Sequence, residues 1–377
     1  MDNLNLFFNP IIIGISVTII LIAILAVLTS PFLNKLKMGR TEDIQKQKEN
    51  LPPISIVLYA HEQTTALAQN LPVLLEQTYP SSYQVIVVTD KDNLGTEDLM
   101  KQLCSKYPHL YVIYLPTSSR YMSRRKLAIT LGVKAAQTEW IVITDPTCKP
   151  HHANWLTAMA YHLNDSVGFV MGYAALSNDT PKFWQFEHAM QAYHRLCAAK
   201  HQHAWSTNSP NIALRKSMFM ENDGFRNNLR FARGEYDFLV NEYACKTTTA
   251  IAIAKEGWRN LHTNFLAIRS KLHGHVGYRT KMFFYSLLPY ISIITSFLGI
   301  AGGIMRQQWI LLCASVLALL LLIILRTLLA KRVNKLLENP IGTASLFFHE
   351  IAYCWHSISY RFQYWRADKV SFSSHKL

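Results

Sequence analysis

The segment Trp140-Ile-Val-Ile-Thr-Asp145-Pro-Thr-Cys148 is the clearest indication of the fold of this chain. Its uninterrupted apolar run is typical of a strand buried in a parallel sheet, and it ends at an acid that a proline follows. Ligands of open parallel sheets bind beyond the carboxyl ends of the strands, so Asp145 is well placed to hold a metal–phosphate group. Mg²⁺ and Mn²⁺ favour charged oxygens, yet the residue two positions later is Thr147. The stretch therefore indicates a nucleotide-dependent enzyme with one acid fewer than such a site usually has.

Similar apolar runs recur on both sides of this stretch, and segments with helical periodicity separate them. We predict strands at 54–59, 84–89, 110–115, 140–144, 167–172 and 212–214, and helices at 67–77, 96–107, 123–136, 151–163, 181–200 and 236–246. Alternating strands and helices predict a doubly wound α/β domain with a mostly parallel sheet.

Three apolar segments without charge, at 11–28, 283–304 and 309–325, have about the length that crosses a bilayer core. The first lacks a small-x-small cleavage site and a basic leader, which favours an uncleaved anchor over a signal peptide. The net charge of +14 comes from 38 Lys and Arg against 24 Asp and Glu, and much of it flanks these segments. The positive-inside rule then predicts that residues 35–281 and the C-terminus lie in the cytoplasm. We assign the basic excess to anionic lipid and expect no nucleic-acid partner.

These patterns predict six parts of the chain. They are an N-terminal transmembrane anchor at 1–33, a polar linker at 34–52, a catalytic domain at 53–260, an interfacial segment at 261–282, a transmembrane hairpin at 283–330 and an amphipathic cytoplasmic segment at 331–377. The aromatic-rich stretch 346–365 predicts an interfacial helix, and packing against the spans explains it equally well. A transporter is disfavoured because the three spans carry no intramembrane charge. The six cysteines have no C-x-x-C spacing and are expected to be free thiols.

A series of short motifs runs through residues 52–260. In order, they are Pro53–Glu62, Asn70–Pro80, Val85–Asp90, Ser119–Thr130, Thr144–Cys148, Trp155-Leu156, Asn211–Lys216, Gly224-Phe225 and Gly234–Glu242. In order and spacing this series resembles the family 2 glycosyltransferases, in particular their membrane-bound bacterial members. The resemblance implies a glycosyltransferase A-type fold, which is Rossmann-like, between one N-terminal and two C-terminal transmembrane helices. It also implies a nucleotide-diphosphate-sugar donor, Mg²⁺ or Mn²⁺, and inverting transfer by a hexosyltransferase-like enzyme.

The resemblance also implies which residues bind the donor. In the family, the acid that matches Asp90 contacts the nucleotide, as does the region of Glu62, and Lys126 matches a further contact position. Arg124 and Arg125 precede Lys126 at the start of a predicted helix, where guanidinium groups and the helix N-terminus favour phosphate. The alternatives are a solvated turn acid for Asp90 and a solvated or lipid-facing surface for the basic residues.

Two positions depart from the family pattern. Asp145 matches the first acid of the Asp-x-Asp metal motif, but Thr147 replaces the second and brings no charge. One unit-charge pair at ~4 Å is worth roughly 4 kcal/mol at an effective dielectric of ~20 before desolvation, so weak metal binding is expected. Tyr236 stands where the family has its base, and a phenol is a poor base at neutral pH. Its neighbours Asp237 and Glu235 are the candidate catalytic acids, unless both serve the N-terminus of the helix.

Two hypotheses follow. The first is a transferase of the inner membrane whose cytoplasmic domain moves a sugar to an envelope glycan or lipid-linked acceptor, with other envelope-biosynthesis proteins as partners. The second is a catalytically degenerate member that acts as a binding or scaffold partner in a membrane assembly. Residues 269–273 read Arg-Ser-Lys-Leu-His where processive members carry a Gln/Arg-x-x-Arg-Trp element, which argues against processive synthesis.

Overall fold

The computed structural model describes residues 10–36, 51–91, 94–115, 122–207, 210–229, 236–256, 276–339 and 341–366. The chain divides into two compact units. The helical unit comprises Met1–Lys35 and His275–Arg366, and the globular unit comprises Leu36–Gly274 together with Ala367–Leu377. Residues 261–275, which include most of the expected interfacial segment and the stretch 269–273, lie outside the described residues.

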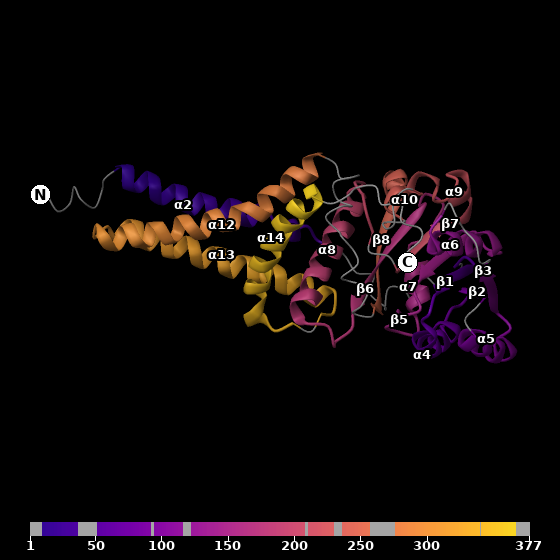
Figure 1. Ribbon diagram of the computed structural model, residues 1–377. Helices are drawn as coiled ribbons and strands as arrows, with labels where there is room; N and C mark the ends of the chain where they lie inside the picture. Colours follow the sequence, from indigo (N-terminus) through magenta and orange to yellow (C-terminus); the bar gives the residue numbers. More distant parts are fainter. Residues whose placement is uncertain are drawn as a thin grey trace, which may run out of the picture. The chain divides into compact units, whose positions relative to one another are not determined.

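The globular unit is built on an eight-stranded sheet with the order β3-β2-β1-β4-β7-β6-β8-β5 (Figure 1). Its strands are β1 (Ile54–Ala60), β2 (Tyr83–Asp90), β3 (Leu110–Leu115), β4 (Trp140–Thr144), β5 (Lys149–Pro150), β6 (Phe169–Leu176), β7 (Ile212–Arg215) and β8 (Thr247–Glu256). β3, β2, β1 and β4 are parallel, β7 is antiparallel to both its neighbours, and β8 is parallel to β6. The predicted mostly parallel α/β sheet is confirmed, and β5 and β8 extend it beyond the prediction.

The helices of the globular unit follow the predicted alternation. They are α4 (Thr64–Leu75), α5 (Leu94–Lys106), α6 (Arg124–Ala135), α7 (Trp155–Ala160), α8 (Lys182–Lys200), α9 (Lys216–Glu221) and α10 (Asp237–Glu242). Two predicted helices were too long. The one at 151–163 is only α7, because the chain after it turns through i to i+3 bonds such as Leu163 N to Ala160 O at 2.9 Å. The one at 236–246 ends as α10 and continues as a 3₁₀ turn at Ala244–Lys246.

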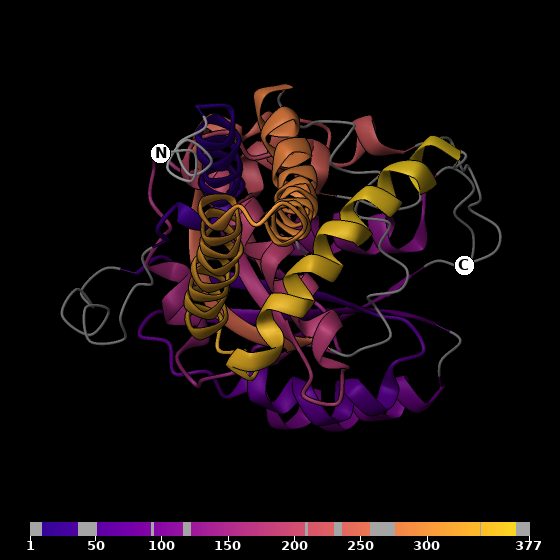
Figure 2. The same ribbon diagram turned by 90° about the vertical axis from the view of Figure 1, so that its left-hand side faces the viewer.

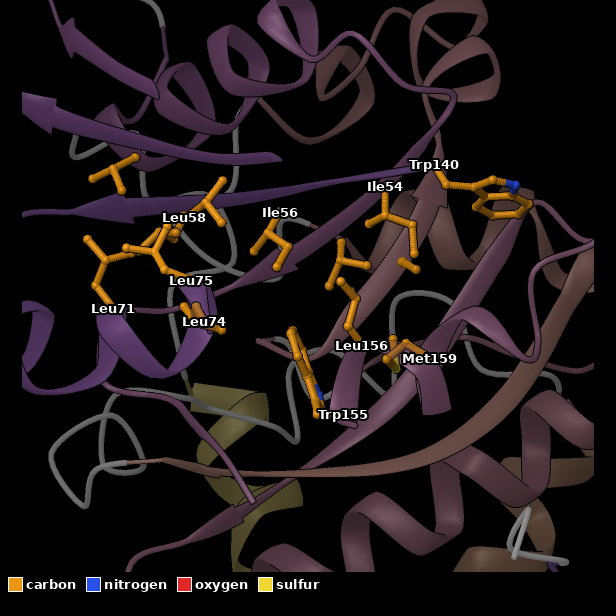
Figure 3. Close-up of a cluster of buried hydrophobic side chains, with 14 of the residues drawn as sticks. Ile54, Ile56, Leu58, Leu71, Leu74, Leu75, Trp140, Trp155, Leu156 and Met159 are labelled. Atoms are coloured by element: carbon orange, nitrogen blue, oxygen red, sulfur yellow. The ribbon is translucent and has the colours of Figure 1, made fainter. Parts of the chain in front are cut away.

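The core lies between one face of the sheet and two helices (Figure 3). Alternate side chains of β1 (Ile54, Ile56 and Leu58) are fully buried in one cluster with residues of α4 and α7. The other face of β1 meets α6. A Cβ atom on Gly132 of α6 would lie only 2.4 Å from Val57 Cγ1. The absent side chain thus lets α6 approach the sheet closely, and this close approach positions the first turn of α6 over the strand ends.

The helical unit contains α2 (Pro10–Leu28), α12 (Val276–Met305), α13 (Trp309–Leu336) and α14 (Thr343–Arg366). Three stretches, Pro10–Leu28, Phe283–Met305 and Trp309–Leu336, are long and apolar enough to cross a membrane, as predicted. Figure 2 views α2, α12 and α13 nearly end-on, with α14 running obliquely across them. Many large apolar side chains of the three candidate spans are exposed in the structure, which is the surface expected of helices that face lipid.

The helix of the third candidate span is longer than the apolar run that predicts it. The uncharged run ends at 325, but α13 continues to Leu336, and Arg326, the first residue after the run, is fully buried. An Arg326 guanidinium nitrogen lies 2.7 Å from Glu350 Oε1 of α14, and Nη1 donates to the carbonyl of Ala26 in α2 at 3.0 Å. The same guanidinium lies 4.8 Å from the centre of the Tyr285 ring of α12. Four helices of this unit therefore meet at one buried cation.

Candidate functional site

The carboxyl ends of three adjacent strands define the candidate site. β1 lies between β2 and β4, and the chain runs outward from β1 through β2 to β3 before it returns to the other side of β1 as β4. Such a reversal of strand order is the place where open α/β sheets bind ligands. His61 follows β1, Asp90 ends β2 and Asp145 follows β4. The sheet therefore brings the two predicted acids to one edge, with β1 between them.

Asp90 lies in a cluster of hydrogen-bond donors. Tyr59 Oη donates to Asp90 Oδ2 at 3.2 Å, and His61 Nδ1 lies 2.5 Å from the same oxygen. Arg124 Nε donates to Asp90 Oδ1 at 3.0 Å, and a second nitrogen of this guanidinium binds the same oxygen. The Asp90 side chain keeps 12% of its surface exposed. The prediction of a simple solvated turn acid does not describe this arrangement.

The cluster also fixes the protonation of its members. Burial alone would raise the pKa of the Asp90 carboxyl, but the hydrogen bonds and charges of Arg124 and His61 outweigh it and hold this pKa below its usual value. Burial and the nearby charge of Asp90 raise the pKa of the Tyr59 phenol to about 12. At neutral pH, Asp90 is therefore an anion and Tyr59 a hydrogen-bond donor.

Asp145 is the first residue of a tight turn that holds its side chain in place. The Cys148 amide donates to the Asp145 carbonyl at 2.8 Å, and Pro146 takes the second position of the turn, which its fixed φ suits. Thr147 donates twice to Asp145 Oδ1, from its amide at 3.1 Å and from its hydroxyl at 2.8 Å. Asn70 of α4 donates to the Pro146 carbonyl at 2.8 Å. Thr147 thus stabilises both the turn and the Asp145 carboxylate. A carboxylate in place of Thr147 would instead repel the carboxylate of Asp145.

Two consecutive arginines of α6 reach the two acids. Arg124 forms an ion pair with Asp90, and Arg125 Nη1 donates to Asp145 Oδ2 at 2.9 Å. Ser123 caps the helix, because its hydroxyl oxygen accepts from the Lys126 amide at 3.4 Å. The first turn of α6 therefore places two cations and the positive end of a helix between the strand ends, which is an arrangement suited to phosphate.

The other predicted site residues lie in different surroundings. The Lys126 side chain is fully buried. Glu62 is exposed, adopts a φ of 52°, and has no hydrogen-bond or ion-pair partner among the described residues. Asp237 is the first residue of α10, is 3% exposed, and accepts a hydrogen bond from the Ser206 hydroxyl at 2.8 Å. Glu235 lies outside the described residues.

Tyr236 is a core residue. It is 1% exposed, and its ring packs edge-on against the ring of Phe225 with 5.7 Å between the centroids. An aromatic side chain at this position adds buried apolar area beside Asp237. The position therefore stabilises the start of α10, and the candidate base is its neighbour.

Sequence reasoning gave no role to Tyr59 or His61 and little weight to Arg125. The signal for His61 is strand register: Ala60 of β1 pairs with Thr89 of β2, so the next residue of each strand, His61 and Asp90, must meet. The signal for Arg125 is weaker, since it depends on which side of α6 faces the strand ends.

Three comparisons with known proteins bear on this site. Residues 55–223 match the family model described as glycosyl transferase family 2. Glycosyltransferase AglE of Haloferax volcanii is 24% identical over 107 residues, which are 28% of this chain and 34% of that relative. The alignment thus spans about a third of the relative's length.

A solved structure extends the likeness to the whole fold. The mannosyltransferase PcManGT from Pyrobaculum calidifontis, in complex with GDP-Man and Mn²⁺, has a TM-score of 0.53 at 15% identity, with 95% of this chain and 100% of that chain covered. At this identity the likeness concerns the fold, which is glycosyltransferase A-like. The two comparisons agree: residues 55–223 match glycosyl transferase family 2, and the fold is glycosyltransferase A-like.

Proposed function

We propose that the chain is a membrane-anchored glycosyltransferase that moves a sugar from a nucleoside-diphosphate sugar to an envelope glycan or lipid-linked acceptor, with inversion. The observation that carries this proposal is the pairing of two consecutive arginines of α6 with Asp90 at the end of β2 and Asp145 just after β4. A diphosphate needs cations and a nucleoside needs hydrogen-bond acceptors, and this edge of the sheet offers both. The mannosyltransferase of similar fold binds a donor of this class, GDP-Man.

The cluster around Asp90 and the group formed by Asp145 and the first turn of α6 suit different parts of such a donor. Asp90 is an anion at neutral pH and is held in place by Arg124, so it can accept a hydrogen bond from a nucleobase N–H or a ribose hydroxyl. The guanidinium groups and the N-terminus of α6 suit the diphosphate, whose negative charge grows as the bond to the sugar breaks. Both groups lie at the carboxyl ends of neighbouring strands in one sheet, so one donor molecule can bridge them.

Inverting transfer also needs a base. The acceptor hydroxyl attacks the anomeric carbon, a new C–O bond forms as the bond to the diphosphate breaks, and the hydroxyl proton passes to a carboxylate. Asp237 is our candidate for this carboxylate, and the hydrogen bond from Ser206 orients it. Glu235 remains the alternative from the sequence.

A divalent metal at Asp145 is what the family resemblance implies, and the related mannosyltransferase structure holds Mn²⁺. The described residues do not fit this ion. Asp145 Oδ2 accepts from Arg125, Oδ1 accepts two hydrogen bonds from Thr147, and no second carboxylate stands in the turn. Mg²⁺ and Mn²⁺ require several oxygen ligands, preferably charged ones.

The three apolar helices support the membrane part of the proposal. The basic residues that flank them favour an orientation with residues 35–281 in the cytoplasm, where nucleotide sugars are made. We therefore place the protein in the inner membrane, in contact with anionic lipid and with other proteins of envelope biosynthesis.

A direct assay tests the transfer. Purified full-length protein in detergent is given a panel of nucleotide sugars with and without Mn²⁺, and release of nucleoside diphosphate is measured. Asp237→Asn should lower the rate by about 10²-fold or more, the usual contribution of a general base. Asp98→Asn, at an acid of α5 whose side chain is 82% exposed, is the matched control.

Two results would count against the proposal. They are a parent protein that releases no diphosphate from any donor, and an Asp90→Ala variant that binds nucleotide as the parent does. Both together would favour the scaffold hypothesis, which the altered positions Thr147 and Tyr236 motivate.

A further inference from the structure

The Asp145 carboxylate already has a cation beside it, at the position where the family resemblance implies a metal. Arg125 Nη1 lies 2.9 Å from Asp145 Oδ2, and the Asp145 side chain is only 5% exposed. Thr147 supplies two donors to the other oxygen. All three of these groups donate hydrogen bonds, whereas a metal site would present further acceptors to share the ion.

From this geometry we infer that the Arg125 guanidinium replaces the divalent cation, so that the diphosphate of the donor is bound without metal. The inference rests on the proposed function, since it assumes a nucleoside-diphosphate donor at this edge. The inference concerns which cation neutralises Asp145 and the diphosphate of the donor.

The charge balance of the turn supports this reading. Two acids and one divalent cation sum to zero, and so do the one acid and one guanidinium found here. Thr147 makes the second arrangement consistent, because its hydroxyl and amide satisfy Asp145 without adding negative charge. With an acid in place of Thr147, the turn would hold two adjacent carboxylates and only one cation.

Arg125 is also placed to meet a ligand. Its side chain is 33% exposed while that of Asp145 is 5% exposed, so the guanidinium is the more accessible side of the pair. A guanidinium has five N–H donors in a planar fork, which allows one group to bind a carboxylate and a phosphate together. Arg125 stands in the first turn of α6, a helix of 12 residues, where the helix dipole also favours an anion.

Arg124 makes the neighbouring contact with Asp90 in the same helical turn. The site therefore presents two guanidinium groups, each already anchored by a carboxylate. Anchoring lowers the cost of ordering a long side chain when the ligand binds.

The test measures binding of UDP and GDP to full-length protein in detergent by calorimetry, once in excess EDTA and once in millimolar Mn²⁺. We expect the parent to bind the preferred nucleotide with the same dissociation constant, within about twofold, in both buffers. Arg125→Gln should weaken binding by about ten- to a hundredfold in both, the loss expected for a hydrogen bond to a charged group. Arg125→Lys, which keeps the charge, should recover part of this loss in EDTA.

A double variant that removes the guanidinium and restores the second acid sharpens the test. The double variant Arg125→Gln with Thr147→Asp restores two acids and removes the guanidinium, and its binding should depend on Mn²⁺. Arg226→Gln is the matched control, because this arginine is 73% exposed and pairs with Asp223, three residues before it. Circular dichroism of each variant excludes unfolding as the cause.

The outcomes separate the inference from the proposed function. A parent that binds nucleotide only with Mn²⁺ overturns the inference and leaves the transferase proposal standing, because a metal would then displace Arg125 from Asp145. A folded Arg125→Gln variant that binds as the parent does in EDTA also overturns it. A parent that binds no nucleotide in either buffer overturns the proposed function itself.

Discussion

The buried pair between Arg326 and Glu350 allows a sharp test of what holds the helical unit together. The two side chains are 0% and 1% exposed, and their charged atoms lie 2.7 Å apart. Glu350 also accepts from the Tyr285 hydroxyl at 3.2 Å. We expect Glu350→Ala to destabilise the helical unit, because the change leaves a guanidinium buried without its counter-charge.

The magnitude follows from the geometry. At 2.7 Å and an effective dielectric of ~20, the attraction is roughly 6 kcal/mol before desolvation. Removing one partner of a buried pair typically costs about 3–5 kcal/mol, whereas replacing both by apolar residues of similar volume is often neutral. Glu350→Ala should therefore cost about 3–5 kcal/mol, and Arg326→Met with Glu350→Met should cost about 1 kcal/mol or less.

A cysteine provides the assay. Cys354 of α14 is fully buried, and an Arg326 nitrogen lies 3.6 Å from its sulfur, so an alkylating reagent reaches it only when this packing opens. Labelling of Cys354 in detergent, followed by mass spectrometry, should accelerate by about 10²-fold or more in Glu350→Ala. Cys148, which is buried in the globular unit, is the internal reference and should label at the parent rate.

The reasoning would be refuted by a double variant that opens as readily as Glu350→Ala. In that case the loss would come from packing volume and the charge pairing would contribute little. Unchanged labelling of Cys354 in Glu350→Ala would refute it as well.

Three shorter predictions concern the globular unit. Folding lowers the pKa of Asp90 below its ordinary value, so its stabilising contribution is complete above the unfolded pKa and is lost as pH falls through the folded pKa; acid unfolding of Asp90→Asn should therefore be less steep below about pH 4. Gly172→Ala should lower the unfolding free energy by about 1–3 kcal/mol in denaturant titrations, since the new Cβ would lie 2.8 Å from the Asn211 carbonyl oxygen. Ser206→Ala should lower kcat more than it raises KM, because the hydroxyl orients Asp237 through one hydrogen bond at 2.8 Å.

Each of these has a control. Gly342→Ala, at a glycine with no atom within 4 Å of the new Cβ, should leave stability nearly unchanged, so an equal loss there would contradict the packing argument. If Asp98→Asn made acid unfolding less steep by as much as Asp90→Asn does, this result would contradict the role of the Asp90 cluster. Restored turnover in Ser206→Thr would support orientation of Asp237, and a loss of folding in Ser206→Ala would contradict it.

The sequence predicts the parallel half of the sheet because buried parallel strands are short, continuous apolar runs. β8 escaped prediction because its sequence, Thr247–Glu256, alternates small alanines with isoleucines and carries little of the bulk that marks a core strand. The full length of α13 could not be predicted, because composition shows where charge begins but not whether the helix continues past it.

The candidate site divides in the same way. That Asp90 and Asp145 lie at one edge could be predicted, because parallel strands end on the same side of a sheet. Their partners could not, because successive residues of a helix point about 100° apart. A small rotation of α6 about its axis decides whether Arg125 or Lys126 faces the acids, and the sequence does not show that rotation.

The meeting of four helices at Arg326 has a consequence for biosynthesis. The guanidinium comes from α13 and its carboxylate from α14, which the ribosome completes later, while the carbonyl of Ala26 comes from the first helix made. Until α14 is made, the Arg326 guanidinium therefore has no Glu350 carboxylate to pair with, and a buried charge without its partner is costly. The packing of the first three helices around Arg326 thus depends on the last helix of the unit, and a chain that stops before α14 would lack the counter-charge.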